Sequence, residues 1–199
     1  MLYNRIFIKN FLFKPCRYTY LVKLLGIYDV IISRRSIRAY KKEPIKEEDL
    51  RKILESARWA PSAGNRQPRH FVVVLDDQVK EKLVPACRGQ RFIANAACII
   101  AGLADVEASP RWAIVDTTIA LEHIVLMATE LGYGTCWIGA FDENEVKKIL
   151  NIPDKYRVIA LITIGVPAES PPPRPRKPLR EIASLNIFGN PIELPEEES

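Results

Sequence analysis

The sequence YRVIALITIGVP, residues 156–167, is the strongest strand candidate in the chain. It is rich in β-branched residues and ends at a proline, which is typical of a buried strand. Two other runs have the same character, HFVVVL at 70–75 and AACIIAGL at 96–103, and 135–138 favours a short strand. These runs predict a sheet with a largely apolar interior.

Helical patterns lie between these strands. Residues 46–60 repeat apolar side chains at helical spacing behind three early acidic residues, which suit the positive end of a helix. A longer helix is predicted over 111–131, central and largely buried, ending at Gly132. Further helices are predicted near 27–35, near 76–84 and after Asp142, which forms a capping-box pair with Glu145. We therefore predict an α+β fold in one domain.

The charge of the protein is unevenly distributed. The 199 residues carry a formal charge of +5, and residues 1–26 hold five basic residues and no acidic one. The remainder is formally neutral, so we expect no nucleic-acid partner. Four cysteines and two histidines show no metal-ligand spacing, which indicates free thiols, no bound metal and a cytoplasmic protein.

The basic and apolar segment 1–26 has three open interpretations. It lacks the features of a signal peptide and is interrupted too often by charge to span a bilayer. It is a surface extension docked on the body, a translated upstream region that the mature protein lacks, or a weak membrane-surface helix. We expect no membrane contact for the protein as a whole.

Four stretches are candidates for chemistry. They are SRRSIRAY at 33–40, APSAGNRQP at 60–68, GYGTCWIGAF at 132–141 and RPRK at 174–177. Clustered arginines offer planar donors to an anion such as phosphate, side-chain amides can bond the edge of a polar ring, and glycines permit close backbone approach. Taken singly, each has an ordinary alternative: a solvated basic turn, a connecting loop, a helix cap with core packing, or a soluble tail.

Taken in this order and spacing, the four motifs resemble the FMN-dependent nitroreductase family over roughly residues 27–185. The resemblance implies a nitroreductase-like fold with a central, mainly antiparallel sheet flanked by helices. It implies a homodimer with FMN at the interface and a C-terminal arm that crosses to the other subunit. The chain then divides into an extension at 1–26, an FMN-binding domain at 27–185 and a tail at 186–199.

The resemblance also assigns contacts to FMN. Phosphate and ribityl contacts fall on Arg34, Arg35, Ser36, Arg174 and Arg176, and Arg38 points to the pyrimidine end of the ring. Contacts at the ring fall on Pro61, Ser62, Asn65 and Gln67, usually from the partner subunit, and on the strand end Ile138, Gly139 and Ala140. The backbone N–H of Gly139 or Ala140 is expected to face flavin N5.

The implied activity is that of an NAD(P)H oxidoreductase. NADH or NADPH reduces FMN, and a small-molecule acceptor (a nitroaromatic, a quinone or a flavin) then takes the electrons in a ping-pong reaction. Neither a metal nor a named catalytic acid or base is required. The alternatives are a flavin-binding sensor or carrier without turnover, and a specialised member such as a dehalogenase or ring dehydrogenase.

Overall fold

The computed structural model describes residues 26–192, and the interpretations of residues 1–25 and 193–199 lie outside the described residues. It contains a four-stranded sheet in the order β1-β2-β4-β3, in which every neighbouring pair is antiparallel. The strands are β1 (Arg69–Val74), β2 (Cys98–Asp105), β3 (Gly134–Ile138) and β4 (Tyr156–Gly165). The predicted strands are confirmed, and the stretch at 156–167 supplies an inner strand that pairs on both sides.

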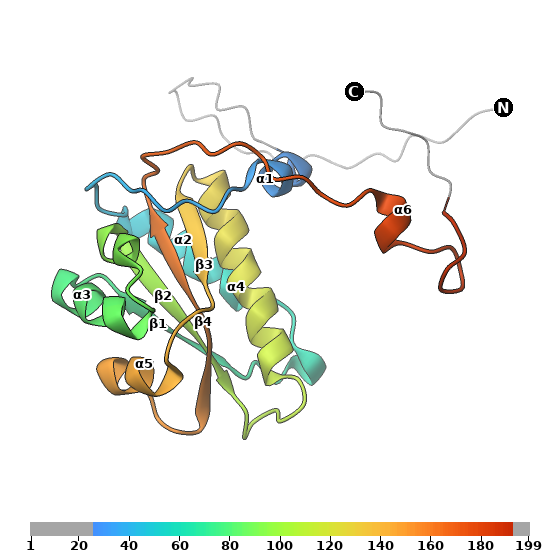
Figure 1. The fold of residues 1–199 in the computed structure, drawn as a ribbon. Helices are drawn as coiled ribbons and strands as arrows, with labels where there is room; N and C mark the ends of the chain where they lie inside the picture. Colours follow the sequence, from blue (N-terminus) through green and yellow to red (C-terminus); the bar gives the residue numbers. More distant parts are fainter. Residues whose placement is uncertain (1–25, 193–199) are drawn as a thin grey trace, which may run out of the picture.

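Helices cover both faces of the sheet (Figure 1). One face packs against α2 (Glu47–Arg58) and α4 (Ala113–Glu130), and the other packs against α3 (Asp77–Ala86) and α5 (Glu143–Leu150). These four helices match the predicted ranges closely. The expectation that α4 is largely buried holds for its inner face only, because the side chains of Ile114 and Val115 are exposed.

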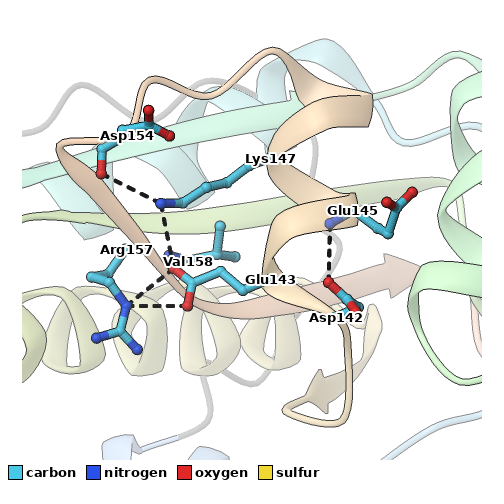
Figure 2. Close-up of polar contacts among 7 residues, drawn as sticks. All are labelled: Asp142, Glu143, Glu145, Lys147, Asp154, Arg157 and Val158. Carbon is cyan, nitrogen blue, oxygen red and sulfur yellow. Dashed lines mark hydrogen bonds and ion pairs between the residues drawn. The ribbon is translucent and has the colours of Figure 1, made fainter.

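Predicted capping interactions fix the position of α5 against the sheet (Figure 2). The Asp142 carboxylate accepts a hydrogen bond of 3.1 Å from the backbone N–H of Glu145, which is the N-cap half of the predicted capping box. The reciprocal bond to the Glu145 side chain is not formed, because the Asp142 N–H donates to the Ala86 carbonyl at 2.8 Å. The Glu143 carboxylate accepts from the backbone N–H of Val158 at 3.0 Å and from Arg157 Nε at 3.1 Å. The first turn of α5 is thereby tied to the start of β4.

Four short elements complete the described chain. The helix predicted at 27–35 is α1 (Ile27–Ser33), whereas η1 (Ala63–Asn65), η2 (Arg91–Asn95) and α6 (Leu179–Ile182) were not predicted. Single turns of this kind are too short to produce a hydrophobic period in the sequence.

An extended segment, residues 36–41, crosses the end of the sheet. The Ile37 N–H donates to the Thr135 carbonyl at 2.8 Å, and the Lys41 N–H donates to the Val166 carbonyl at 2.9 Å. The approach is close because glycines face it: a Cβ on Gly134 would lie 2.7 Å from an Ile37 side-chain carbon. The segment that carries the arginine motif is therefore anchored to two strands.

The chain after β4 runs past α1 and then leaves the body. In Figure 1 the stretch containing α6 extends away from the sheet and its helices. This stretch, which we call the C-terminal arm (residues 179–192), has five exposed large apolar side chains: Leu179, Ile182, Leu185, Ile187 and Phe188. Exposed apolar side chains gathered on one short segment are typical of an interaction surface.

The described cysteines are buried thiols. Cys87, Cys98 and Cys136 are free, and burial raises the pKa of Cys87 to about 11 and that of Cys98 to about 12. Cys16 lies outside the described residues. Within residues 26–192, no helix has both the length and the apolar character needed to cross a membrane.

The contact between Gly134 and Ile37 gives a stability prediction. Gly134→Ala should lower the free energy of unfolding by roughly 1–3 kcal/mol, because the new methyl group overlaps a buried, β-branched side chain. Chemical denaturation measures the change. Gly139→Ala is the matched control. The new Cβ would meet no atom within 4 Å, so the denaturation midpoint of this variant should not fall below that of the wild type. Equal midpoints for Gly134→Ala and the wild type would contradict the close approach.

Candidate functional site

A cavity of about 450 Å³ lies between α1, α4 and the proline-rich segment. Its volume is in the range of small-molecule sites. All six FMN contacts predicted in the two basic motifs line it: Arg34, Arg35, Ser36, Arg38, Arg174 and Arg176. Apolar walls come from Ile31 and Ile32 of α1 and from Pro171, Pro172 and Pro173. The structure thus brings together two arginine motifs from opposite ends of the described chain.

Most of these guanidinium groups are left without protein acceptors. The Arg35 side chain donates to the carbonyls of Ile32 at 2.7 Å and Arg34 at 2.9 Å, which caps the end of α1, and Arg176 donates to the Arg174 carbonyl at 3.2 Å. Among residues 26–192, the side chains of Arg34, Arg38 and Arg174 have no hydrogen bond or ion pair. Such groups can bind an anion without losing an existing partner.

The positive charge of Arg38 and Arg34 acts on Cys136 of β3. Burial raises the pKa of the Cys136 thiol, and the charges of these two arginines oppose that rise. On the other side of the arginine segment, the Glu169 carboxylate accepts a hydrogen bond from the backbone N–H of Arg38. Glu169 therefore fixes the backbone at Arg38, and the guanidinium of Arg38 remains available.

A buried hydroxyl lies next to this segment. Thr135 is 1% exposed, and its Oγ1 has no hydrogen-bond partner within the described part of the chain. Its residue forms a parallel bridge with Ser36 of the cavity wall. A buried hydroxyl without a partner is unusual and indicates a group that a ligand or water satisfies.

The second predicted stretch, 60–68, lies beside the first turn of α4. Asp116, in that turn, accepts a hydrogen bond from the Ala63 N–H at 3.2 Å, whereas α1 lies near the last turns of α4 (Figure 1). The cavity reaches α4 at Glu122, six residues from Asp116 and about 9 Å along the helix. Within one chain, Pro61, Ser62, Asn65 and Gln67 do not line the arginine cavity.

This loop has a strained conformation. Asn65 and Gln67 have φ angles of 53° and 52°, in the left-handed region that favours glycine. The Gln67 N–H donates to Ser62 Oγ at 3.0 Å, so the Ser62 hydroxyl accepts within the loop and can still donate its hydrogen to a ligand. Asn65 and Gln67 themselves are exposed. Strain of this kind persists where the surroundings fix it and is often found at binding sites.

Two residues that the sequence analysis did not select hold the loop in place. The Arg69 side chain donates to the carbonyls of Arg58 at 3.1 Å, Ala60 at 2.6 Å and Pro61 at 3.2 Å, and burial lowers its pKa. Asp116 binds the other side of the loop and is 3% exposed. Arg69 directly follows the motif at 60–68, but its three carbonyl acceptors are set by tertiary folding and leave no sequence signal.

The third set of predicted contacts, 138–140, begins at Ile138, the last residue of β3, and continues into the loop after it. The side chain of Ile138 is 1% exposed and packs in the core beside α3 and α5, so only its backbone is available to a ligand. Gly139 and Ala140 are exposed. β3 is an edge strand, and the Thr135 carbonyl faces its outer edge, where Ile37 binds it. Backbone groups alternate along a strand, so those of Trp137 face the same edge, and Gly139 follows directly after the strand.

One acidic residue of the cavity was also missed. Glu122 of α4 lines the cavity with the arginines, and its Oε2 accepts a hydrogen bond of 3.3 Å from Trp137 Nε1. The sequence marks it only as a polar position on a helix. Metal binding has no support in the described residues, since no three of their His, Cys, Asp or Glu side chains form a group that could hold an ion.

Comparison with known proteins gives the class to which this fold and site belong. The model of the nitroreductase family matches residues 31–105 and 88–166. A relative from Archaeoglobus fulgidus named putative NADH dehydrogenase/NAD(P)H nitroreductase is 36% identical over 148 residues, covering 70% of this chain and 84% of its own. An iodotyrosine deiodinase from Thermotoga neapolitana is 27% identical over 188 residues, and the match covers 81% of this chain and 98% of the deiodinase.

A solved structure agrees with the sequence relatives. The FMN-dependent nitroreductase from Clostridium difficile superposes with a TM-score of 0.74 at 32% identity, covering 80% of this chain and 98% of that protein. The chain belongs to the nitroreductase family. The predicted family and the predicted fold class are confirmed.

Proposed function

We propose that the arginine cavity binds the phosphate of FMN and that the protein is an FMN-dependent NAD(P)H oxidoreductase. The observation that carries the proposal is the convergence of Arg34, Ser36 and Arg38 with Arg174 and Arg176 around one cavity. The residues present fit a phosphomonoester: three guanidinium groups lack protein partners, and Ser36 supplies a hydroxyl. FMN-dependence is also the property named for the similar Clostridium difficile protein.

The edge of β3 supports the position of the rest of the cofactor. Thr135 lies beside Ser36, and Gly139 follows the end of β3, four residues further along the chain, a span of about 13 Å for an extended chain. A ligand whose phosphate lies among the arginines and whose length follows this edge reaches the Gly139 N–H. Because a Cβ on Gly139 would meet no protein atom within 4 Å, the space above it is open to a flat ring. Gly139 is then a better donor to flavin N5 than Ala140.

The residues at 61–67 enter this proposal through a homodimer. Pro61, Ser62, Asn65 and Gln67 do not line the cavity of their own chain, and in the proposed dimer they complete the site of a partner subunit. The exposed apolar side chains of the C-terminal arm support such an assembly, since the described chain does not cover them. In the dimer, the arm of one subunit packs on the other.

Bound FMN supplies two-electron chemistry, accepting hydride from NADH or NADPH and passing electrons to a nitroaromatic, quinone or flavin-type acceptor. The chain's own residues bind and orient. Arg34 and Arg176 hold the phosphate, Arg38 places positive charge toward the pyrimidine end, and the Gly139 N–H donates at N5. No protein acid or base is assigned.

A second candidate is a specialised reductive reaction such as dehalogenation. The observation in its favour is the similarity to the Thermotoga iodotyrosine deiodinase over 98% of that protein. Both candidates share the cofactor site and differ in the acceptor. A flavin-binding sensor or carrier is the remaining alternative, and the first experiment below separates it from an enzyme.

The visible spectrum of the purified protein supplied with FMN tests the function. We expect an oxidised-flavin spectrum that bleaches on anaerobic addition of NADPH or NADH, and whose colour returns when a quinone or nitroaromatic acceptor is added. Bound flavin that stays yellow with both donors would favour the sensor or carrier. A protein that remains colourless with FMN would contradict the proposed cofactor.

Removing two arginines tests the phosphate assignment. In Arg34→Ala with Arg176→Ala, each change removes charge-assisted bonds worth roughly 1.5–3 kcal/mol, so the FMN dissociation constant should rise by about a hundredfold or more. Quenching of flavin fluorescence measures it. Arg51→Ala, which removes an exposed charge from α2 away from the cavity, should leave the constant unchanged. An unaltered constant in the double variant would refute the assignment.

Truncation tests the arm. Deleting residues 179–199 removes all five exposed apolar side chains of the C-terminal arm and should weaken the dimer, as sedimentation across a concentration series would show. Deleting only 193–199 is the control and should leave the dimer intact. A dimerisation constant that is the same in both truncations would count against packing of the arm on a partner subunit.

A further inference from the structure

Glu122 is the only acidic residue among those that line the arginine cavity. A carboxylate is unexpected there, since it repels the anion that the arginines attract. It also forms no ion pair: within residues 26–192, no arginine nitrogen lies within 4.0 Å of its oxygens. Trp137 Nε1 donates a hydrogen bond of 3.3 Å to Glu122 Oε2, so Oε1 remains available as an acceptor.

Trp137 fixes where this carboxylate lies along β3. Thr135, Trp137 and Gly139 are successive alternate residues, and the side chains of Thr135 and Trp137 lie on one face of the strand. Thr135 is beside Ser36 at the arginine end. Glu122 is therefore held by Trp137, whose position in the chain lies between Thr135, beside the predicted phosphate contacts, and Gly139. The part of FMN that joins phosphate to ring is the ribityl chain, which carries hydroxyl groups.

The energetic effect of Glu122 depends on what the anion carries. For free phosphate, the carboxylate adds only repulsion. A phosphomonoester with hydroxyl groups on its chain meets the same repulsion but can donate hydrogen bonds to the carboxylate, and a bond to a charged acceptor is about twice as strong as one to a neutral acceptor. Glu122 then disfavours the binding of free phosphate and favours the binding of a phosphomonoester that carries hydroxyl groups.

We propose that Glu122 is a specificity-determining residue that accepts hydrogen bonds from ligand hydroxyls, so that the cavity selects a polyol phosphomonoester over free phosphate. The inference rests on the proposed function, because it assigns Glu122 to the ribityl chain of the same FMN. It concerns a residue on α4, outside all four sequence motifs. Trp137 acts here as a positioning residue that holds the carboxylate.

The test compares two ligands in Glu122→Ala, Glu122→Gln and the wild type. FMN binding is measured by fluorescence quenching and inorganic phosphate by calorimetry. In Glu122→Ala, FMN should bind about tenfold more weakly, the magnitude for losing a bond to a charged group, while phosphate binds about threefold more tightly. Glu122→Gln keeps an acceptor for Trp137 and for a hydroxyl, so its FMN affinity should fall less while its phosphate affinity rises equally.

Two controls make the result specific. Glu130→Ala removes a carboxylate from the end of the same helix, outside the cavity, and should change neither affinity. A flavin phosphate whose ribityl chain is replaced by a plain alkyl chain should not bind more weakly to Glu122→Ala than to the wild type. Loss of affinity for this analogue as well as for FMN would indicate a structural effect and would overturn the proposal.

The remaining outcomes are also decisive. If both FMN and phosphate bind more tightly to Glu122→Ala, the residue is a simple counter-charge and the proposal is wrong. If neither affinity changes, Glu122 does not contact the ligand and the proposal is wrong. In both cases the wild type still binds FMN, so the proposed function stands. If the wild type does not bind FMN at all, the proposed function fails and this inference fails with it.

Discussion

The close packing of residues 36–41 against two glycines is the contact on which the rest of the site depends. Gly134 admits the side chain of Ile37, and a Cβ on Gly165 would lie 2.9 Å from a ring carbon of Tyr40. Burial raises the pKa of Tyr40 well above its usual range, and its hydroxyl shares a 2.7 Å hydrogen bond with Thr163 of β4. The arginine motif is carried on a segment that the sheet holds rigidly.

Rigid support matters because the arginines repel one another. Guanidinium groups that converge without counter-charges cost free energy, and flexible ones would separate into solvent. Here Arg35 caps α1, Glu169 fixes the backbone at Arg38, and the prolines at 171–173 restrict the chain that delivers Arg174. The fold supports a charge arrangement that an anion then stabilises, which is how a pre-organised anion site gains affinity.

Much of this architecture was predictable from local patterns. The apolar run at 156–167, the amphipathic period of 46–60 and the N-cap at Asp142 each appear as predicted, because strands, helices and caps depend on residues near one another in sequence. The single-turn elements were missed because they are too short to show a period. The order and spacing of the four motifs also identified the family, because both can be read directly from the sequence.

The sequence by itself determined the elements, the fold family and which residue types are available for chemistry. The tertiary structure decided which of them meet: Arg34 and Arg176 share a cavity, whereas Asn65 does not line it. It also supplied the functions of Arg69, Asp116 and Glu122, whose partners lie far away in sequence. The physical reason is that charge pairing and packing depend on distance in space, which a linear pattern does not record.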